Sequence, residues 1–477
     1  MKRTAIIGGG IAGLSAAFYL EKARRSGAEI EWTLFERSNR LGGVIKTEHR
    51  DGFVLEAGPD SFLTIKPDGA QLCRDLGIGD QLIGSNDAER KTYILVKDRL
   101  VPMPDGLQFM VPTRVWPMVT TPLFSWRAKL GMAAEFLGLR GAGRQCQHED
   151  ESVADFVQRH FGRQMVERVA EPLLAGVYGG NADNLSVHAV LPRFVEMERE
   201  HGSLVRASLH SLRQTQKKAA KGNGTGTGAH PQPLFTSLRN GVQQMVDALV
   251  SQLPEGSLRL DQERISLRRA GSQWQVNTAG EKFDAVVLAV PAQASAALVE
   301  PIQPKLAPLL RKISYTSSAA VVLAYDRADL PPGHGILVPA SEGRTMLACT
   351  FVHNKFQHRA PEGAALLRCF ISSARVPNLS DYSDEVLQTM MQNELKEILG
   401  LSSTPRFIRV FRWACALPQY QTGHLERVAE METLLHELPG LHIAGNSLYG
   451  IGIPDCIRSA RKAVDEITSS VLQPAAV

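Results

Sequence analysis

The chain has 477 residues, more than one ordinary hydrophobic core requires, so two or three structural domains are expected. Hydrophobic residues make up 44% of the chain and charged residues 21%, as in globular proteins with a large buried core. The formal net charge of +4 is small for this length and argues against nucleic acid as a partner.

The six cysteines show no CxxC spacing, so the sequence predicts neither a metal site nor a disulfide framework. Reduced thiols of this kind are typical of a cytoplasmic protein, which is the location that we expect. The most apolar stretch, residues 285–299, is interrupted by Pro291, Gln293 and Ser295, so no membrane span is expected.

At the N-terminus an apolar run leads directly into a glycine turn. Residues 4–20 combine this run with an apolar pattern at helical spacing, which predicts a strand, a tight turn and a helix. This is the start of a dinucleotide-binding βαβ unit: Gly8 allows the turn, Gly10 lets the backbone approach a pyrophosphate, and Gly13 lets helix and strand pack closely. The residues expected to contact the cofactor here are Gly8, Gly9, Gly10, Ile11, Ala12 and Gly13.

The second predicted strand, residues 33–36, ends in a carboxylate. Glu36 follows Gly13 by about 20 residues, the spacing at which an acidic side chain accepts hydrogen bonds from both ribose hydroxyls. This carboxylate would repel a 2′-phosphate, so NADP is not expected. Up to this point the pattern fits either NAD or FAD.

The residues after this carboxylate favour FAD. Residues 36–43 resemble the extended ERxxRxGG pattern of the flavoprotein superfamily that contains amine oxidases, carotenoid desaturases and porphyrinogen oxidases. The resemblance implies that a second glycine pair brings backbone beside the diphosphate of FAD. The further cofactor contacts of this pattern are Arg37, Arg40, Gly42 and Gly43.

A short strand and a glycine-proline turn are expected at residues 52–61. The resemblance implies that this turn crosses the flavin, whereas an ordinary loop is the alternative from the residues alone. The positions concerned are Ala57, Gly58, Pro59, Asp60 and Ser61.

The character of the chain changes from residue 66 onward. Amphipathic stretches such as 153–157 and 166–174 replace alternating strands, so a mainly helical insertion is expected up to residue 234. A basic, glycine-rich run at 217–228 is expected to be a solvated linker.

Within this insertion, residues 109–129 place tryptophans beside cations. The three cations are Arg114, Arg127 and Lys129. The mixture fits either contact with a membrane interface or a helix-packing core with solvated arginines, and both interpretations stay open.

Regular structure is expected to resume with a helix at 235–249. Strands follow at 264–267 and 284–291, and the second returns to the nucleotide sheet as a buried strand. We expect Ile265 and Ala289 to contact the cofactor.

The C-terminal region is expected to complete the cofactor site. A strand at 441–446 and a glycine-rich turn at 449–455 lead into a helix at 456–471. The N–H groups at the start of this helix suit the pyrimidine carbonyl of a reduced isoalloxazine, which carries negative charge. The cofactor contacts expected here are Gly445, Ile451, Gly452 and Ile453.

The fold class expected is α/β, or α+β over the whole chain. A Rossmann-like FAD-binding domain, for which the resemblance implies the p-hydroxybenzoate hydroxylase type, takes residues 1–65, 235–291 and 407–477. The helical insertion takes 66–234. An antiparallel-sheet substrate domain takes 292–406. Its strands are expected at 319–325, 346–352 and 366–372.

Three further stretches make the resemblance more specific. Residues 171–187, 412–424 and 445–457 look like the corresponding stretches of the porphyrinogen oxidases. This resemblance implies an FAD-dependent, oxygen-using oxidase of protoporphyrinogen or coproporphyrinogen III in haem synthesis, with hydride transfer to flavin N5 and release of peroxide. The resemblance implies that amine oxidases of the superfamily often attach the flavin through a cysteine in the C-terminal glycine loop. Residues 446–449 contain no cysteine, so FAD is expected to bind without a covalent link.

Substrate contacts are the least defined part of the site. Gly176 is expected to let the backbone lie against the macrocycle, and no catalytic acid or base is assigned. We assign His424 to structure, since loop histidines more often serve it. Mitochondrial-type enzymes carry an arginine where this chain has Thr92, so it looks more like the soluble bacterial branch. Other cations would then hold the propionates: Arg90, Lys91 or Arg114.

The partners expected are a porphyrinogen and molecular oxygen. Hand-over of the product to a ferrochelatase, a homodimer and weak peripheral membrane contact are further expectations.

Several alternatives to this function stay open. An amine oxidase or desaturase of the same superfamily is one alternative. A non-enzymatic protein similar to the prenylated-GTPase chaperones is another. The sequence does not choose between the two porphyrinogens.

Overall fold

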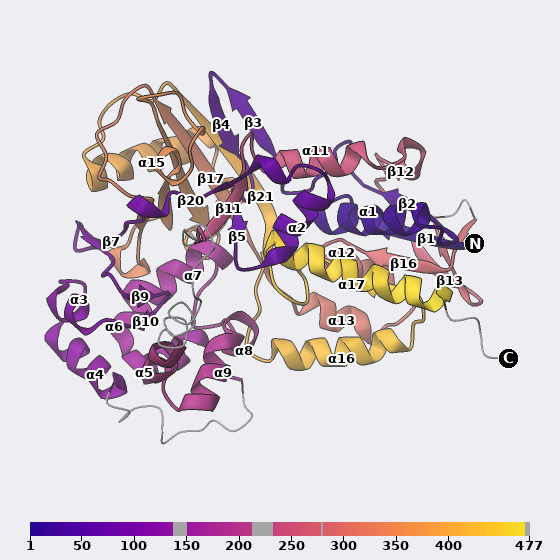
Figure 1. Cartoon of the computed structure of the whole chain (residues 1–477), viewed down its shortest axis with the longest axis horizontal. Coiled ribbons are helices and arrows are strands. Elements are labelled where there is room, and N and C mark those ends of the chain that lie inside the picture. Colours follow the sequence, from indigo (N-terminus) through magenta and orange to yellow (C-terminus); the bar gives the residue numbers. More distant parts are fainter. Residues whose placement is uncertain (137–149, 212–231, 278–279, 473–477) are drawn as a thin grey trace, which may run out of the picture. The chain divides into compact units, whose positions relative to one another are not determined.

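A computed structural model describes residues 1–136, 150–211, 232–277 and 280–472. These residues form two compact units (Figure 1). The first unit comprises Met1–Ser85, Pro233–Ser314 and Leu425–Val477, and the second comprises Asn86–Gln232 and Tyr315–His424. The linker expected at 217–228 lies outside the described residues. Among the helices that are described, none is both long and apolar enough to cross a bilayer.

The centre of the first unit is a parallel five-stranded sheet in the order β12-β2-β1-β16-β22. Its inner strands are short, apolar and buried, as expected of a parallel sheet that is covered on both faces. The bounds in sheet order are β12 (Leu258–Arg259), β2 (Ile30–Phe35), β1 (Lys2–Ile7), β16 (Ala285–Leu288) and β22 (Leu441–Ile443). Strands from both ends of the chain therefore share one sheet.

A helix from each end of the chain also packs against the other within the first unit. Helix α1 (Ile11–Arg25) and helix α17 (Ile453–Leu472) lie side by side and contribute buried side chains to one core (Figure 1). The remaining helices of this unit are α2 (Pro67–Asp75), α11 (Gln243–Ser251), α12 (Ala292–Val299), α13 (Leu306–Arg311) and most of α16 (His424–His436). The expected strand-turn-helix at the N-terminus and the expected C-terminal helix are both confirmed.

Smaller sheets complete the first unit. Strands β3 (Thr47–Arg50) and β4 (Phe53–Glu56) pair with each other. Strand β11 (Phe235–Leu238) pairs with β5 (Phe62–Leu63) and β6 (Leu82–Gly84). A third sheet contains β13 (Leu267–Ala270), β14 (Gln273–Val276) and β15 (Glu281–Phe283).

One expected helix is wrong in its first half. The helix expected at 235–249 begins only at Gln243, because Phe235–Leu238 forms β11 instead. The physical reason is tertiary pairing with two strands distant in sequence, followed by a turn at Gly241, whose φ is +101°.

The second unit is built on a seven-stranded sheet in the order β21-β17-β20-β19-β18-β7-β8, antiparallel except for the β18–β7 pair. The bounds in that order are β21 (Phe407–Pro418), β17 (Tyr315–Tyr325), β20 (Ala365–Ser372), β19 (Ala348–Phe351), β18 (Gly335–Leu337), β7 (Thr92–Val96) and β8 (Arg99–Pro102). Helix α15 (Asp384–Leu399) packs on it through buried Leu387, Met391 and Leu395. The expected antiparallel strands of this region are confirmed.

The same unit contains a group of short helices. They are α3 (Val115–Thr120), α4 (Trp126–Phe136), α5 (Val153–Phe161), α6 (Arg163–Met165), α7 (Glu171–Tyr178), α8 (Val187–Val190) and α9 (Pro192–His201), with a π-helical turn at Val166–Ala170 before α7. A short hairpin of β9 (Leu107–Gln108) and β10 (Val111–Pro112) precedes them.

The two units group residues differently from the three regions expected from the sequence. Strands β7 and β8 lie inside the expected helical insertion, yet they extend the sheet of the second unit. Residues 66–85 and 292–314 fall in the first unit, and 407–424 fall in the second because β21 pairs with β17.

Candidate functional site

Gly8 and Gly13, on either side of the start of α1, leave no room for a side chain. A Cβ on Gly8 would lie 2.5 Å from the carbonyl oxygen of Ala289, and a Cβ on Gly13 would lie 1.8 Å from that of Gly8. Gly10 differs, because a Cβ there would meet no protein atom within 4 Å. The backbone at Gly10 is thus open to a ligand, while its two partners serve the packing of strand and helix.

This open position is also the start of a helix. Gly10 is the N-cap of α1 and has no side chain to cap it, and the first turn contains no acidic residue. The first N–H groups of a helix have no partner within the helix, and together with its dipole they favour an anion. The turn therefore has the geometry of a phosphate site.

A second glycine loop packs directly on the first. The N–H of Gly42 donates to the carbonyl oxygen of Gly9 at 2.8 Å, and Gly42 forms an isolated parallel β-bridge with Gly10. The side chain of Arg40 holds this loop by donating to the carbonyl oxygens of Leu41, Ile45 and Gly43. The two loops expected to face a diphosphate therefore form one continuous surface.

Glu36 lies at the end of β2 beside this surface. One carboxylate oxygen accepts from the N–H of Gly9 at 2.6 Å, and the other accepts from the N–H and hydroxyl of Ser38, both at 2.8 Å. A carboxylate offers about four acceptor positions, so with three of them used about one remains for a ligand hydroxyl. The carboxylate is held in place by the same turn that leaves Gly10 open.

The expected glycine-proline turn packs against the second glycine loop. The N–H of Ala57 donates to the carbonyl oxygen of Lys46 at 2.9 Å, and a Cβ on Gly58 would lie 1.8 Å from the carbonyl oxygen of Val44. From the other side, Ser237 donates to the carbonyl oxygen of Asp60 at 2.6 Å. This turn is therefore fixed next to the glycine loops and is more than a surface connection.

The C-terminal turn meets the N-terminal one. Gly445 has a φ of +113°, and a Cβ there would lie 3.7 Å from the Cβ of Ala12. Its N–H donates to Ser459 on α17 at 2.8 Å. Residues Ile451 and Gly452 are half-buried and lead into α17 at Ile453. The two ends of the chain therefore pack against each other, as expected.

Sequence reasoning missed an ion pair at the start of α17. The carboxylate of Asp455 is buried and lies 2.6 Å from Nζ of Lys66, and it also accepts from the N–H of Gly452 at 3.2 Å and from Arg458. An acidic residue in the first turn after a glycine-rich segment is a capping pattern that could have indicated it.

The other expected cofactor residues are less central. Ala289 follows β16 directly and lies against Gly8. Ile265 is half-buried in the connection before β13, and this connection is bonded to the Glu36 region through Gln262 N–H. Arg37 is exposed.

The expected substrate residues lie in the second unit on separate elements. Gly176 is exposed on α7, and a Cβ there would meet no atom within 4 Å. Arg90 and Lys91 are exposed before β7, and Arg114 is exposed at the start of α3. Among the described contacts, none joins these three cations to one another.

His424 lies inside the second unit. Its side chain is buried and stacks on Tyr420 with ring centres 4.1 Å apart and planes at 16°. This packing supports the assignment of His424 to structure.

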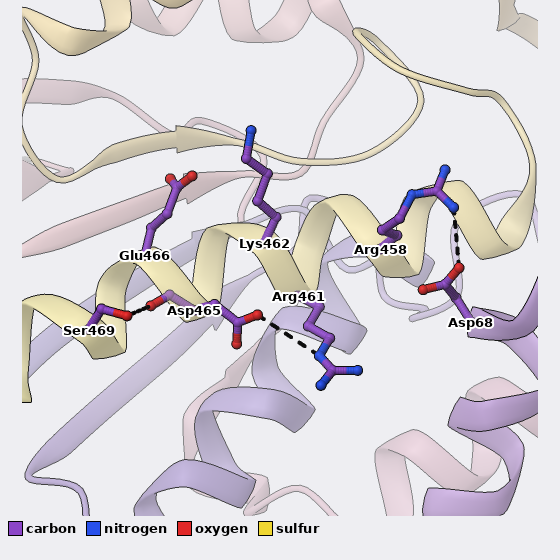
Figure 2. A pocket seen from close by; sticks show the side chains of 7 residues that line it. All are labelled: Asp68, Arg458, Arg461, Lys462, Asp465, Glu466 and Ser469. Atoms are coloured by element: carbon purple, nitrogen blue, oxygen red, sulfur yellow. Dashed lines mark hydrogen bonds and ion pairs between the residues drawn. The ribbon is translucent and has the colours of Figure 1, made fainter.

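A groove lined by Asp68 and by polar residues between 458 and 469 of α17 is separate from the glycine loops. Figure 2 shows Arg458 paired with Asp68 and Arg461 paired with Asp465, with Lys462 and Glu466 beside them. The cations and anions balance, and the groove lies away from the helix N-terminus. We assign no ligand to it.

Comparison with known proteins agrees with this geometry. The model of the flavin containing amine oxidoreductase family matches residues 11–468. The chain belongs to this family, and a flavin is its cofactor.

Within this family the chain is similar to porphyrinogen oxidases. The chain is 34% identical over 473 residues to the coproporphyrinogen III oxidase of Bacillus subtilis (strain 168), covering 98% of this chain and 97% of that protein. It is also 34% identical over 491 residues to the coproporphyrinogen III oxidase of Propionibacterium freudenreichii subsp. freudenreichii, covering 98% and 91%. The crystal structure of a putative protoporphyrinogen oxidase from Exiguobacterium sp. 255-15 superimposes with a TM-score of 0.84 at 30% identity, covering 98% and 99%.

Proposed function

We propose that this chain is an FAD-dependent oxidase that converts coproporphyrinogen III to coproporphyrin III in haem biosynthesis. The observation that supports it most is the open backbone at Gly10, flanked by the N-terminus of α1 and by the carboxylate of Glu36. The substrate class comes from the two oxidases that are similar to the chain over nearly its full length.

In this proposal the first unit holds FAD. The diphosphate lies against the two glycine loops, and Glu36 accepts from the ribose hydroxyls. The turn at 57–61 and the start of α17 flank the isoalloxazine. The proposed contacts are Gly8, Gly9, Gly10, Ile11, Ala12, Gly13, Glu36, Arg37, Arg40, Gly42, Gly43, Ala57, Gly58, Pro59, Asp60, Ser61, Ile265, Ala289, Gly445, Ile451, Gly452 and Ile453.

The FAD of this proposal is bound without a covalent link. The cysteine nearest to the start of α17 is Cys456, whose side chain is buried. Burial raises the pKa of its thiol to about 12, so it stays protonated and a poor nucleophile. Denaturation in trichloroacetic acid should release all the flavin into the supernatant.

A bound flavin would supply the redox chemistry: three times in succession it would take a hydride from the porphyrinogen, which also loses a proton each time, and it would pass each electron pair to oxygen to give hydrogen peroxide. The protein's task is to hold the macrocycle in place. Gly176 offers exposed backbone on α7, and the propionates pair with Arg90, Lys91 or Arg114. We assign no catalytic acid or base, because positioning against the cofactor accounts for most of the rate that such a site must supply.

The experiment that tests this function compares substrates on the purified, flavin-loaded protein. Coproporphyrinogen III, protoporphyrinogen IX and a primary amine are prepared anaerobically, oxygen is admitted, and porphyrin fluorescence and peroxide are followed. Faster porphyrin formation from coproporphyrinogen III supports the proposal. Amine oxidation alone would indicate another oxidase of the family, and colourless protein that cannot be loaded with flavin would indicate a binding protein.

A weak contact with an anionic membrane surface is the second part of the proposal. On α3 and α4, Trp116, Trp126 and Leu130 are 75%, 68% and 71% exposed. Residues 106–134 contain three cations and no acidic residue, and Nζ of Lys129 lies 4.6 Å from the ring centre of Trp126. Exposed tryptophans beside cations are typical of helices that lie in a membrane interface.

A location and further partners are also part of this proposal. The protein would work in the cytoplasm as a homodimer. Oxygen would be its electron acceptor, and a ferrochelatase would receive the porphyrin. Light scattering of the loaded enzyme, alone and mixed with a ferrochelatase, measures both associations.

A further inference from the structure

Helix α7 is held at its C-terminal end by polar side chains from the sheet of the second unit. Nε2 of Gln419 donates to the carbonyl oxygen of Tyr178 at 2.7 Å, and the hydroxyl of Ser372 donates to that of Gly179. The last carbonyl groups of a helix lack partners within the helix, so these bonds complete the helix end from outside. The side chain of Gln419 is buried, and a Cβ on Gly180 would lie 1.7 Å from its amide oxygen.

The N-terminal end of α7 is held in a similar way. The carboxylate of Glu171 accepts from Nη2 of Arg375 at 2.9 Å and from the N–H of Ala340 at 3.2 Å. Nη1 of the same arginine donates to the carbonyl oxygens of Val338 and Met346 at 2.8 and 2.9 Å. One guanidinium thus ties the first residue of α7 to the two chain segments that follow β18 and precede β19.

Both holding points are largely shielded from water. The side chains of Arg375 and Glu171 are 11% and 15% exposed. Buried polar contacts of this kind specify one arrangement more strictly than apolar packing does, because a shifted helix would leave each group unpaired.

Because of the turn before α7, the orientation of this helix depends more on the contacts at its two ends. Val166–Ala170 is a π-helical turn, which breaks the regular hydrogen-bond ladder between α6 and α7. The preceding helix therefore does not fix the direction of α7 by itself. Between the two holding points, Gly176 and Val177 remain exposed.

We propose that Gln419 and the Glu171–Arg375 pair are positioning residues, which fix both ends of α7 and so fix the place at which its exposed residue Gly176 contacts the substrate macrocycle. This inference rests on the proposed function, because it takes Gly176 as a substrate contact. A displacement of about 1 Å can slow a positioned reaction about 100-fold, so the effect should appear in the chemical step.

The test is the rate constant of anaerobic flavin reduction by saturating coproporphyrinogen III, measured in a stopped-flow instrument per bound flavin. In Gln419→Met, which keeps the volume but loses the donor, we expect this rate constant to fall between about 10-fold and 100-fold. Reduction by dithionite, which needs no contact with α7, should be unchanged. The matched control is Gln392→Met on α15, which should behave as the unmodified protein.

A second variant covers the other end of the helix and the case that Gln419→Met folds poorly. Arg375→Lys keeps the charge beside Glu171 but loses the planar fork that reaches two carbonyl groups. A fall in the reduction rate constant of the folded, flavin-loaded variant supports the inference. Variants that only melt at a lower temperature, with unchanged reduction by substrate, would overturn it while leaving the proposed function intact. If the unmodified protein is not reduced by any porphyrinogen, the proposed function fails and the inference fails with it.

Discussion

The carboxylate of Glu36 lies 2.6 Å from the backbone nitrogen of Gly9 and accepts its N–H. The side chain that is expected to bind a ribose is therefore part of the turn that is expected to bind a diphosphate. A change at either residue disturbs both functions of this surface.

The first prediction concerns this carboxylate. Replacing it in Glu36→Ala removes a charged acceptor, an interaction of about 1.5–3 kcal/mol, so FAD should bind roughly 10-fold to 100-fold more weakly. The measurement is a titration of apoprotein with FAD, followed by quenching of flavin fluorescence. Glu29→Ala, at a strongly exposed position of the same unit, is the control. Equal affinities of the two variants would contradict the assignment of Glu36.

The second prediction separates binding from folding within one glycine turn. In Gly13→Ala the new Cβ would lie 1.8 Å from the carbonyl oxygen of Gly8, so the protein should lose about 3 kcal/mol of stability or fail to fold. In Gly10→Ala the new Cβ meets only open space within the protein, so the apoprotein should melt as before. Its FAD content after purification should nevertheless fall, since the methyl group occupies the space of the ligand. An apoprotein destabilised equally by both changes would refute this distinction.

The third prediction concerns a buried charge cluster in the second unit. His160 is fully buried, with Nδ1 3.2 Å from Glu135 and Nε2 3.1 Å from Glu198, and Arg159 binds both Glu198 and Glu151. Burial alone would lower the pKa of His160, but the two carboxylates outweigh it and raise the pKa above its usual value. Burial would raise the pKa of Glu198, but its bonds with Arg159 and His160 lower it to about 2.

The sign of each pH effect follows from these shifts. The histidine contributes stability that is complete below about pH 6.5 and is lost as the pH rises through its raised pKa. The glutamate contributes stability that is complete above about pH 4.5 and is lost as the pH falls toward about 2. In His160→Gln the alkaline loss of stability should disappear while the acid loss stays, as measured by urea midpoints between about pH 2 and pH 9. The control variant His188→Gln, on α8 of the same unit, should keep both the alkaline and the acid loss of stability. An unchanged alkaline loss in His160→Gln would show that another group causes it.

The fourth prediction concerns the exposed tryptophans of α3 and α4. The double variant Trp116→Ser/Trp126→Ser should bind anionic vesicles at least about 10-fold more weakly than the unmodified protein, with no loss of oxidase activity on dissolved substrate. Flotation with phosphatidylglycerol vesicles measures the binding. Tyr382→Ser, at another exposed aromatic position of the second unit, is the control. If unmodified protein does not float with these vesicles, the face has another role.

The parts of the site that the sequence predicts correctly are those with local causes. The turn around Gly8 and the end of β2 follow from residues close in the chain, because glycine conformations and strand ends are local properties. The joining of the two chain ends was expected from the strand, the turn and the helix N-terminus near the C-terminus, although no local property of either end predicts the particular contact between Ala12 and Gly445.

The parts that the sequence does not predict depend on distant partners. Phe235–Leu238 has the composition of a helix or a strand, and its pairing with β5 and β6 decides between them. The holding points of α7 join residues 204 and 241 positions apart, and such contacts leave no periodic pattern in the chain. The Glu171–Arg375 pair can be recognised only when both partners are placed in space.

The most direct test of the central claim is anaerobic mixing of the flavin-loaded protein with coproporphyrinogen III, followed by the visible absorbance of the flavin. We expect the absorbance to bleach in a single turnover, and we expect oxygen to restore it while porphyrin and peroxide appear. Flavin that stays oxidised in the presence of the porphyrinogen, in protein that dithionite reduces normally, would contradict the proposed function.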